Sequence, residues 1–199
     1  MWTRSLKIKE QPSNKPIYTL KFTSALPGFS MVIATIDTDA VVAAAKVSLF
    51  RNTTELVLGD PSSNGKAGGS KRVEMKFAGI WKHNHYVLSL PLPGGGQGST
   101  MDLEWKGTND VDGFMKKMDR GLHQKLVVAG SESGSGSGGS GVLAKYVHDS
   151  YSMDVAGTVE IFENAPEGVG MGWREWDSFV LVSVLAVVDK TISLMKTAM

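Results

Sequence analysis

The sequence predicts a mainly β protein, in which an antiparallel barrel of about eleven to twelve strands surrounds a central hydrophobic helix at the C-terminal end. Two observations support this fold class. Most of the chain consists of short segments in which apolar and polar residues alternate between turn residues. The last part instead carries an uncharged run, Ser178–Val188, which as a helix would be apolar on every side. Such a helix needs surrounding protein, and the strands supply it.

The C-terminal run is the element on which this architecture depends. Its five valines favour a strand by propensity, and periodicity alone does not settle an apolar run of this length. The residues beyond it favour a helix, because one apolar face continues at steps of three or four positions. This face consists of Leu181, Leu185, Val188, Ile192, Met195 and Met199. Asp177 precedes the run as a predicted N-cap, where a negative charge suits the helix dipole.

The run is too short to cross a membrane. As a helix its eleven residues cover about 16 Å, against about 30 Å of bilayer hydrocarbon, and Asp189 and Lys190 follow directly. We therefore predict a buried core helix and no transmembrane span. We also expect Leu185→Asp to prevent folding, because an unpaired carboxylate in an apolar interior costs several kcal/mol.

Eleven strands are predicted before the helix, within a single domain that covers residues 1–199. Their ranges are 2–9, 18–23, 31–36, 41–50, 55–58, 71–78, 85–90, 101–106, 122–129, 142–148 and 155–163. The alanines in 41–50 leave a short helix open as an alternative there. The Gly/Ser stretch at 130–141 is predicted to be a flexible loop, either natural or engineered.

Composition narrows the function classes. The chain has 21 lysines and arginines against 20 aspartates and glutamates. Its net charge is therefore too small to attract nucleic acid by long-range electrostatics. The absence of cysteine excludes a disulfide scaffold, a thiolate metal site and a cysteine nucleophile. The N-terminus has no apolar stretch of signal-peptide length, which predicts an intracellular, cytoplasmic protein.

From residue 103 onward the order of motifs resembles the tubby C-terminal-like superfamily, above all its small fungal members of unknown function. The segments that carry the resemblance are Leu103-Glu-Trp-Lys106, Leu126-Val-Val, Val142-Leu-Ala-Lys-Tyr146, Gly157-Thr-Val-Glu-Ile-Phe162, and then Asp177 with the apolar helix. The phospholipid scramblases and the plant LURP-one-related proteins share this architecture. The resemblance covers residues 101–190 and implies about twelve strands around a central helix. Tubby proteins bind phosphoinositides through basic residues, whereas the lack of cysteine and of an acidic calcium loop argues against scramblase activity.

One basic cluster is a candidate lipid-binding site. It consists of Lys116, Lys117, Arg120, His123 and Lys125, with Phe114, Met115 and Met118 interleaved. Cations near an anionic membrane surface contribute about 1 kcal/mol each. The alternative is a solvated turn, because Asp112 and Asp119 partly cancel the charge.

Other motifs have simpler structural explanations. The stretch 59–67 resembles a phosphate-binding loop, but it has five residues between its glycines and an alanine after Lys66, so we read it as a hairpin loop. His83 and His85 have a spacing that permits a shared metal, but no third ligand is placed beside them, and we predict strand-end histidines. No nucleophile motif or carboxylate pair indicates catalysis.

The sequence therefore predicts a non-enzymatic binding domain without cofactor or metal, which recognises phosphoinositide or another anionic lipid headgroup. One alternative is a protein-interaction module whose partner contacts loops 59–70 and 91–100. Another is a barrel that binds a small apolar ligand.

Overall fold

A computed structural model gives the fold of residues 5–22, 30–48, 51–61, 70–79, 85–93, 99–108, 122–130, 141–149, 157–162, 166 and 168–197, the part of the chain that the structure describes. Eleven strands lie in one antiparallel sheet, in the same order as in the sequence. They are β1 (Ser5–Lys9), β2 (Pro16–Phe22), β3 (Met31–Thr35), β4 (Val41–Lys46), β5 (Thr53–Leu58), β6 (Lys71–Gly79), β7 (His85–Pro91), β8 (Thr100–Gly107), β9 (Gln124–Val128), β10 (Val142–His148) and β11 (Gly157–Ile161).

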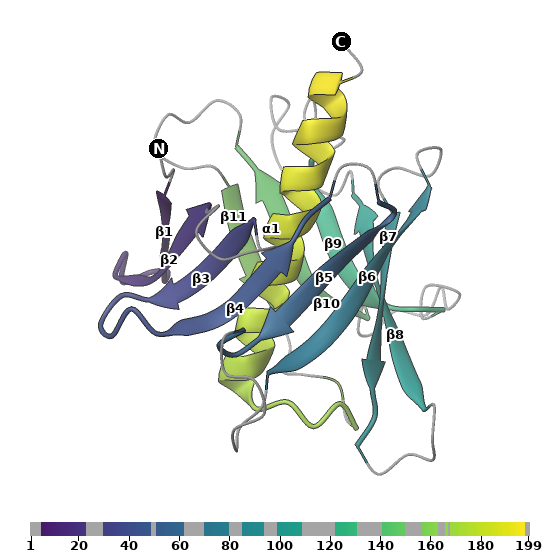
Figure 1. The fold of residues 1–199 in the computed structure, drawn as a ribbon, viewed down its shortest axis with the longest axis horizontal. Coiled ribbons are helices and arrows are strands. Elements are labelled where there is room, and N and C mark those ends of the chain that lie inside the picture. Colours follow the sequence, from purple (N-terminus) through teal and green to yellow (C-terminus); the bar gives the residue numbers. More distant parts are fainter. Residues whose placement is uncertain are drawn as a thin grey trace.

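The single helix among the described residues, α1 (Trp173–Thr197), runs through the space enclosed by the curved sheet, and its C-terminal turns extend past the strands (Figure 1). The predicted mainly β fold with a central C-terminal helix is thus confirmed. The segment 41–50, for which a helix was the alternative, contains strand β4. The predicted N-cap is wrong: the helix begins at Trp173, so Asp177 lies in its second turn, and Glu175 is the acidic residue of the first turn.

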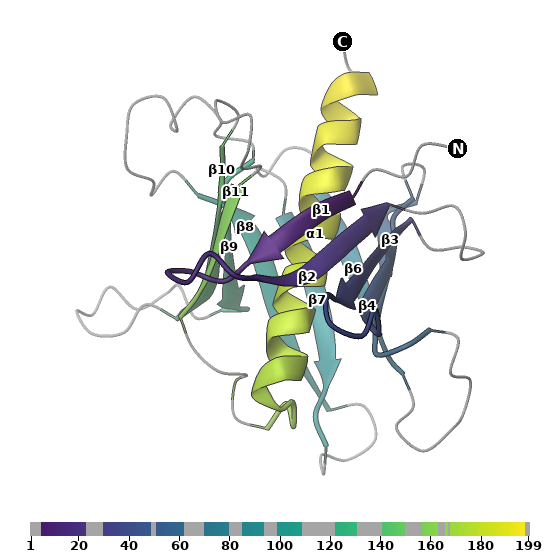
Figure 2. The same ribbon diagram turned by 90° about the vertical axis from the view of Figure 1, so that its left-hand side faces the viewer.

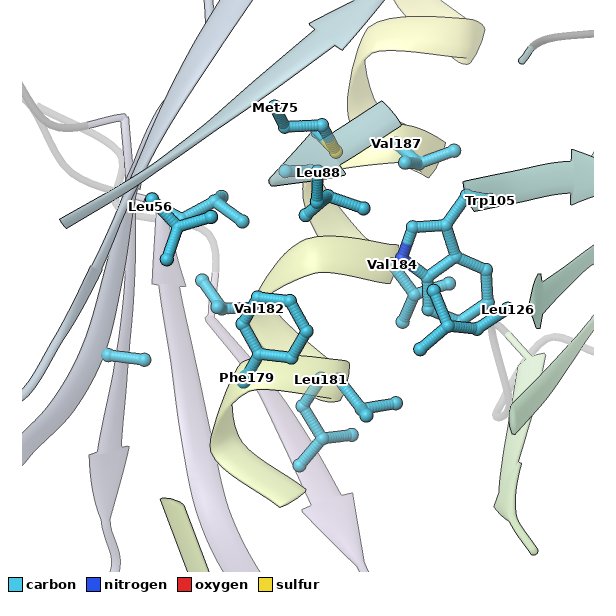
Figure 3. Close-up of a cluster of buried hydrophobic side chains, with 14 of the residues drawn as sticks. Leu56, Met75, Leu88, Trp105, Leu126, Phe179, Leu181, Val182, Val184 and Val187 are labelled. Carbon is cyan, nitrogen blue, oxygen red and sulfur yellow. The ribbon is translucent and has the colours of Figure 1, made fainter. Parts of the chain in front are cut away.

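The core lies between α1 and the inner face of the sheet. Inward side chains of the middle strands, among them Leu56, Leu88 and Trp105, are fully buried, as are Val182 and Val184 of the helix. Figure 3 shows Trp105 and Leu126 beside Val184, with the indole nitrogen directed toward the helix. Side chains alternate between the two faces of a strand, so each strand places one row of side chains against α1. In most strands this inner row is apolar and the outer row largely polar, whereas β3 and β4 are buried at consecutive positions.

Three polar contacts fix how α1 is rotated inside the sheet. Trp105 Nε1 donates a hydrogen bond to Ser183 Oγ at 2.9 Å, and the hydroxyls of Tyr86 and Thr191 lie 3.2 Å apart. Lys190 Nζ donates to the carbonyl oxygen of Arg51 at 2.6 Å. Because these partners belong to β8, β7 and the residues just before β5, one side of the helix is bound to the middle of the sheet.

The predicted barrel is open on one side. The strand order is a linear series from β1 to β11, and within the described residues those two end strands do not pair with each other. The helix covers the inner face of the sheet, but the sheet does not close around it.

Candidate functional site

The outer face of the sheet carries a row of three lysines. Lys106 in β8 lies directly opposite Lys125 in β9, which lies directly opposite Lys145 in β10. Directly opposed residues of antiparallel strands have Cβ atoms about 5 Å apart, and like charges there are unfavourable. All three side chains are partly buried. We call Lys106, Lys125 and Lys145 the lysine row.

Acidic residues flank the lysine row at both ends. Glu104 Oε2 lies 2.5 Å from Lys106 Nζ, and its other oxygen lies 3.4 Å from His85 Nε2, close enough for an ion pair when the histidine is protonated but outside hydrogen-bond geometry. At the other end Glu160 lies opposite Lys145. Glu104 and Glu160 thus each stand beside an outer member of the lysine row, and Lys125 lies between the other two lysines.

Only part of the predicted lipid-binding cluster lies within the described residues. Lys116, Lys117 and Arg120 lie outside them, whereas Lys125 is the middle member of the lysine row. His123 is fully buried, and its Nδ1 accepts a hydrogen bond from the backbone N–H of His148 at 3.1 Å. The prediction that His123 faces a lipid headgroup is therefore wrong, because its ring is enclosed and its Nδ1 serves a neighbouring strand.

Tyr146 and His148 form a second polar cluster with His123, on the adjacent strand. The Tyr146 hydroxyl lies 2.9 Å from His148 Nδ1, and burial raises the pKa of Tyr146. A Cβ atom on Gly157 would come within 2.5 Å of the Tyr146 hydroxyl oxygen, so glycine is required for the tyrosine to lie across β11. These contacts connect β10 to β11 and to His123, just before β9.

The motifs with simpler explanations show no group of metal ligands among the described residues. Across the described ranges, no three histidine, aspartate or glutamate side chains are grouped as metal ligands, and His83 lies outside those ranges. The stretch 59–67 lies between β5 and β6, which pair antiparallel, but residues 62–67 are outside the described ranges, so the hairpin loop stays a prediction. Trp176 is buried and stacks on Phe179, whereas Trp173 is 62% exposed.

The lysine row escapes a reading of the sequence alone. Its members are separated by 19 and 20 positions, and only the register of β8 against β9 and of β9 against β10 brings them together. Each lysine does sit between inward-facing residues of its own strand, for example Lys125 between Gln124 and Leu126. The sequence therefore places each lysine on the outer face of its strand, but it does not give the register that aligns the three.

The chain matches no family model, no curated protein and no solved structure. Within the described residues, no helix combines the length and apolar character that a membrane crossing requires. The choice of the lysine row as the candidate site therefore depends on its geometry alone.

Proposed function

We propose that this protein is a non-enzymatic, tubby-like binding domain that recognises an anionic group, such as the phosphates of a lipid headgroup, on the lysine row. The observation that carries the proposal is the direct opposition of Lys106, Lys125 and Lys145 across three neighbouring strands. Opposite charges at neighbouring positions of a sheet attract each other. An anion placed over the row would lie close to three cations at once, because the register brings their side chains together on one face.

The connection between β8 and β9 supports the same location. It leaves the sheet just after Lys106 and returns just before Lys125, two members of the lysine row. The predicted cluster residues Lys116, Lys117 and Arg120 belong to this connection, and they lie outside the described residues. They stay part of the proposal as a prediction from the sequence.

The two alternatives have less support. The helix α1 fills the space inside the sheet that an apolar ligand would need, and Val182, Val184 and Val187 are fully buried there. Loops 59–70 and 91–100 stay predictions as a protein-interaction surface, because residues 62–69 and 94–98 lie outside the described ranges.

A vesicle-binding experiment tests the proposal. Wild type and Lys125→Glu with Lys145→Glu are mixed with neutral vesicles, with vesicles containing phosphatidylserine, and with vesicles containing a phosphoinositide. We expect wild type to bind the anionic vesicles, more weakly as salt rises, and the double variant to lose about tenfold or more in affinity, since each cation near the surface contributes about 1 kcal/mol. Adding Lys116→Glu and Lys117→Glu extends the test to the connection.

The matched control is Lys46→Glu with Lys76→Glu, which makes the same change in net charge at exposed positions on β4 and β6. This control should retain vesicle binding. A soluble inositol phosphate or inorganic phosphate that protects wild type against thermal unfolding, without vesicle binding, would point to a free phosphate ligand. Equal binding of all variants to all vesicles would refute the proposal.

A further inference from the structure

Two strand edges face the same side of the molecule. β1 pairs with β2 and β11 pairs with β10, and within the described residues neither has a second neighbour. Figure 2 looks onto this side, where β1 crosses in front of α1 and β11 stands to its left. The outer edge of each strand presents backbone N–H and C=O groups to whatever lies beside it. We call the space between these two edges the opening.

The number of strands determines what fits there. All ten pairings in the sheet are antiparallel, so every odd-numbered strand runs in the same direction. β1 and β11 are therefore parallel to each other, and they cannot close an all-antiparallel barrel by pairing directly. One additional strand that runs in the opposite direction would pair antiparallel with both.

The helix presents an apolar face toward the opening. Ser183 and Lys190 contact the middle of the sheet, and Leu185 and Ile192 follow each of them by two positions, about 200° around the helix. Leu185 and Ile192 are accordingly only partly buried. Leu181 and Val188 lie on the same face with 7% and 8% exposure, whereas Val182, Val184 and Val187 have none.

The inward side chains of the two end strands share this partial exposure. Leu6 and Ile8 of β1, and Val159 and Ile161 of β11, pack against the core but are not fully buried. Their counterparts in the middle strands, such as Leu88, have no exposed surface. Partly exposed apolar side chains therefore lie on β1, on α1 and on β11, the three elements beside the opening.

The charge beside the opening favours a particular kind of strand. Lys7 and Lys9 are exposed on the outer side of β1. On the other edge, Glu160 already lies opposite Lys145 in β10. The outer side chains of an incoming strand would be neighbours of the two β1 lysines, and opposite charges at such cross-strand positions are favourable.

We propose that the opening binds an extended peptide segment of a protein partner as a twelfth strand. In this segment apolar side chains alternate with acidic ones, so that the apolar residues cover Leu185 and its neighbours and the acidic residues face Lys7 and Lys9. Main-chain hydrogen bonds to the two edges supply affinity, and the alternation supplies specificity. The segment runs antiparallel to β1 and to β11.

Synthetic peptides of about ten residues, the length of a long strand, test this proposal on the whole chain. The probe alternates valine and glutamate. One control peptide has the same composition with its valines in a single block, and the other alternates valine and lysine. We expect only the alternating valine–glutamate peptide to bind measurably, and amide hydrogen exchange in β1 and β11 to slow when it does.

Protein variants then locate the site. Lys7→Glu with Lys9→Glu should weaken the valine–glutamate peptide about tenfold and improve binding of the valine–lysine peptide, while Lys46→Glu with Lys76→Glu leaves both unchanged. Leu185→Glu should abolish peptide binding. If that variant does not fold, Ile161→Ser, at the half-buried edge of β11, replaces it with the same expected loss.

Several outcomes would overturn the proposal. Equal binding of the blocked and alternating peptides would show that no strand is recognised. A dimer in solution that dissociates on Leu185→Glu would identify a second copy of this chain as the occupant. Protection of the β1 and β11 amides equal to that of β7 in the isolated monomer, together with no peptide binding, would mean that another part of this chain already covers the edges.

Discussion

The middle of the sheet and its two ends are built from the same sequence pattern but differ in what covers them. Leu56 and Leu88 in the middle have no exposed surface, whereas Leu6 of β1 and Ile161 of β11 are only partly buried. All four are apolar residues that pack toward the hydrophobic core. The difference arises because each middle strand has a neighbour on both sides, while each end strand has one. Alternation therefore identifies the inner face of a strand, but closure of the sheet decides whether that face is fully buried from solvent.

Two neighbouring residues of the helix show the same difference in burial, and substitutions at them are expected to have the largest effect. Val184 is fully buried, whereas Leu185 is partly exposed. We expect Val184→Asp to prevent folding, because a buried carboxylate without a partner costs several kcal/mol, comparable to the stability of a whole domain. Leu185→Asp should leave a folded protein, which revises the expectation from the sequence. Circular dichroism with thermal unfolding distinguishes them, and equal loss of structure in both variants would contradict an opening beside Leu185.

Truncation of matched sheet residues gives a smaller effect. Leu88→Ala removes a fully buried side chain, and a loss of about 2 to 5 kcal/mol in the free energy of unfolding is expected. Ile161→Ala, at an edge position that already contacts solvent, should cost less than half as much. Urea titration of both variants measures this ratio. Equal losses would mean that β11 is as well covered as β7.

The smallest expected effect is a pH dependence of the free energy of unfolding. It arises from Lys190, on the side of the helix that contacts the middle of the sheet. Burial lowers the pKa of Lys190 from its usual 10.5, so the unfolded chain holds this proton more tightly than the folded chain. The free energy of unfolding contributed by Lys190 therefore rises with pH between the folded pKa and 10.5. We expect the difference in stability between wild type and Lys190→Met to shift in favour of wild type as pH rises through this window.

The comparison with Lys190→Met is needed because buried tyrosines act in the opposite direction. Burial raises the pKa of Tyr86 and of Tyr146, so both favour the folded state less as pH rises above 10. These contributions are present in both proteins and cancel in the difference. A difference in stability that does not change with pH would show that Lys190 is well solvated.

Much of the fold was predictable because its elements are local. Each strand and the C-terminal helix follow from spacing within a few residues, and the eleven strands and α1 are confirmed. The first turn of the helix was missed, because Trp173–Trp176 precede the apolar run that signalled it. His123 was predicted to be an exposed cation because it lies next to a basic segment of the sequence. In the structure it is fully buried just before β9, and its ring accepts a hydrogen bond from β10.

The sequence by itself determined most of the strands, that the C-terminal run becomes the central helix, and, for the alternating strands, which side faces it, since these depend on residue type and local period. For 41–50 it left a helix open, and in β3 and β4 consecutive buried residues do not distinguish the two sides. Only the tertiary structure decided which lysines stand together and where the helix remains accessible. Both depend on register and on the number of strands: Lys106, Lys125 and Lys145 meet through pairing across three strands, and an odd count leaves β1 and β11 parallel. Pairing between distant segments has no signature in any one of them.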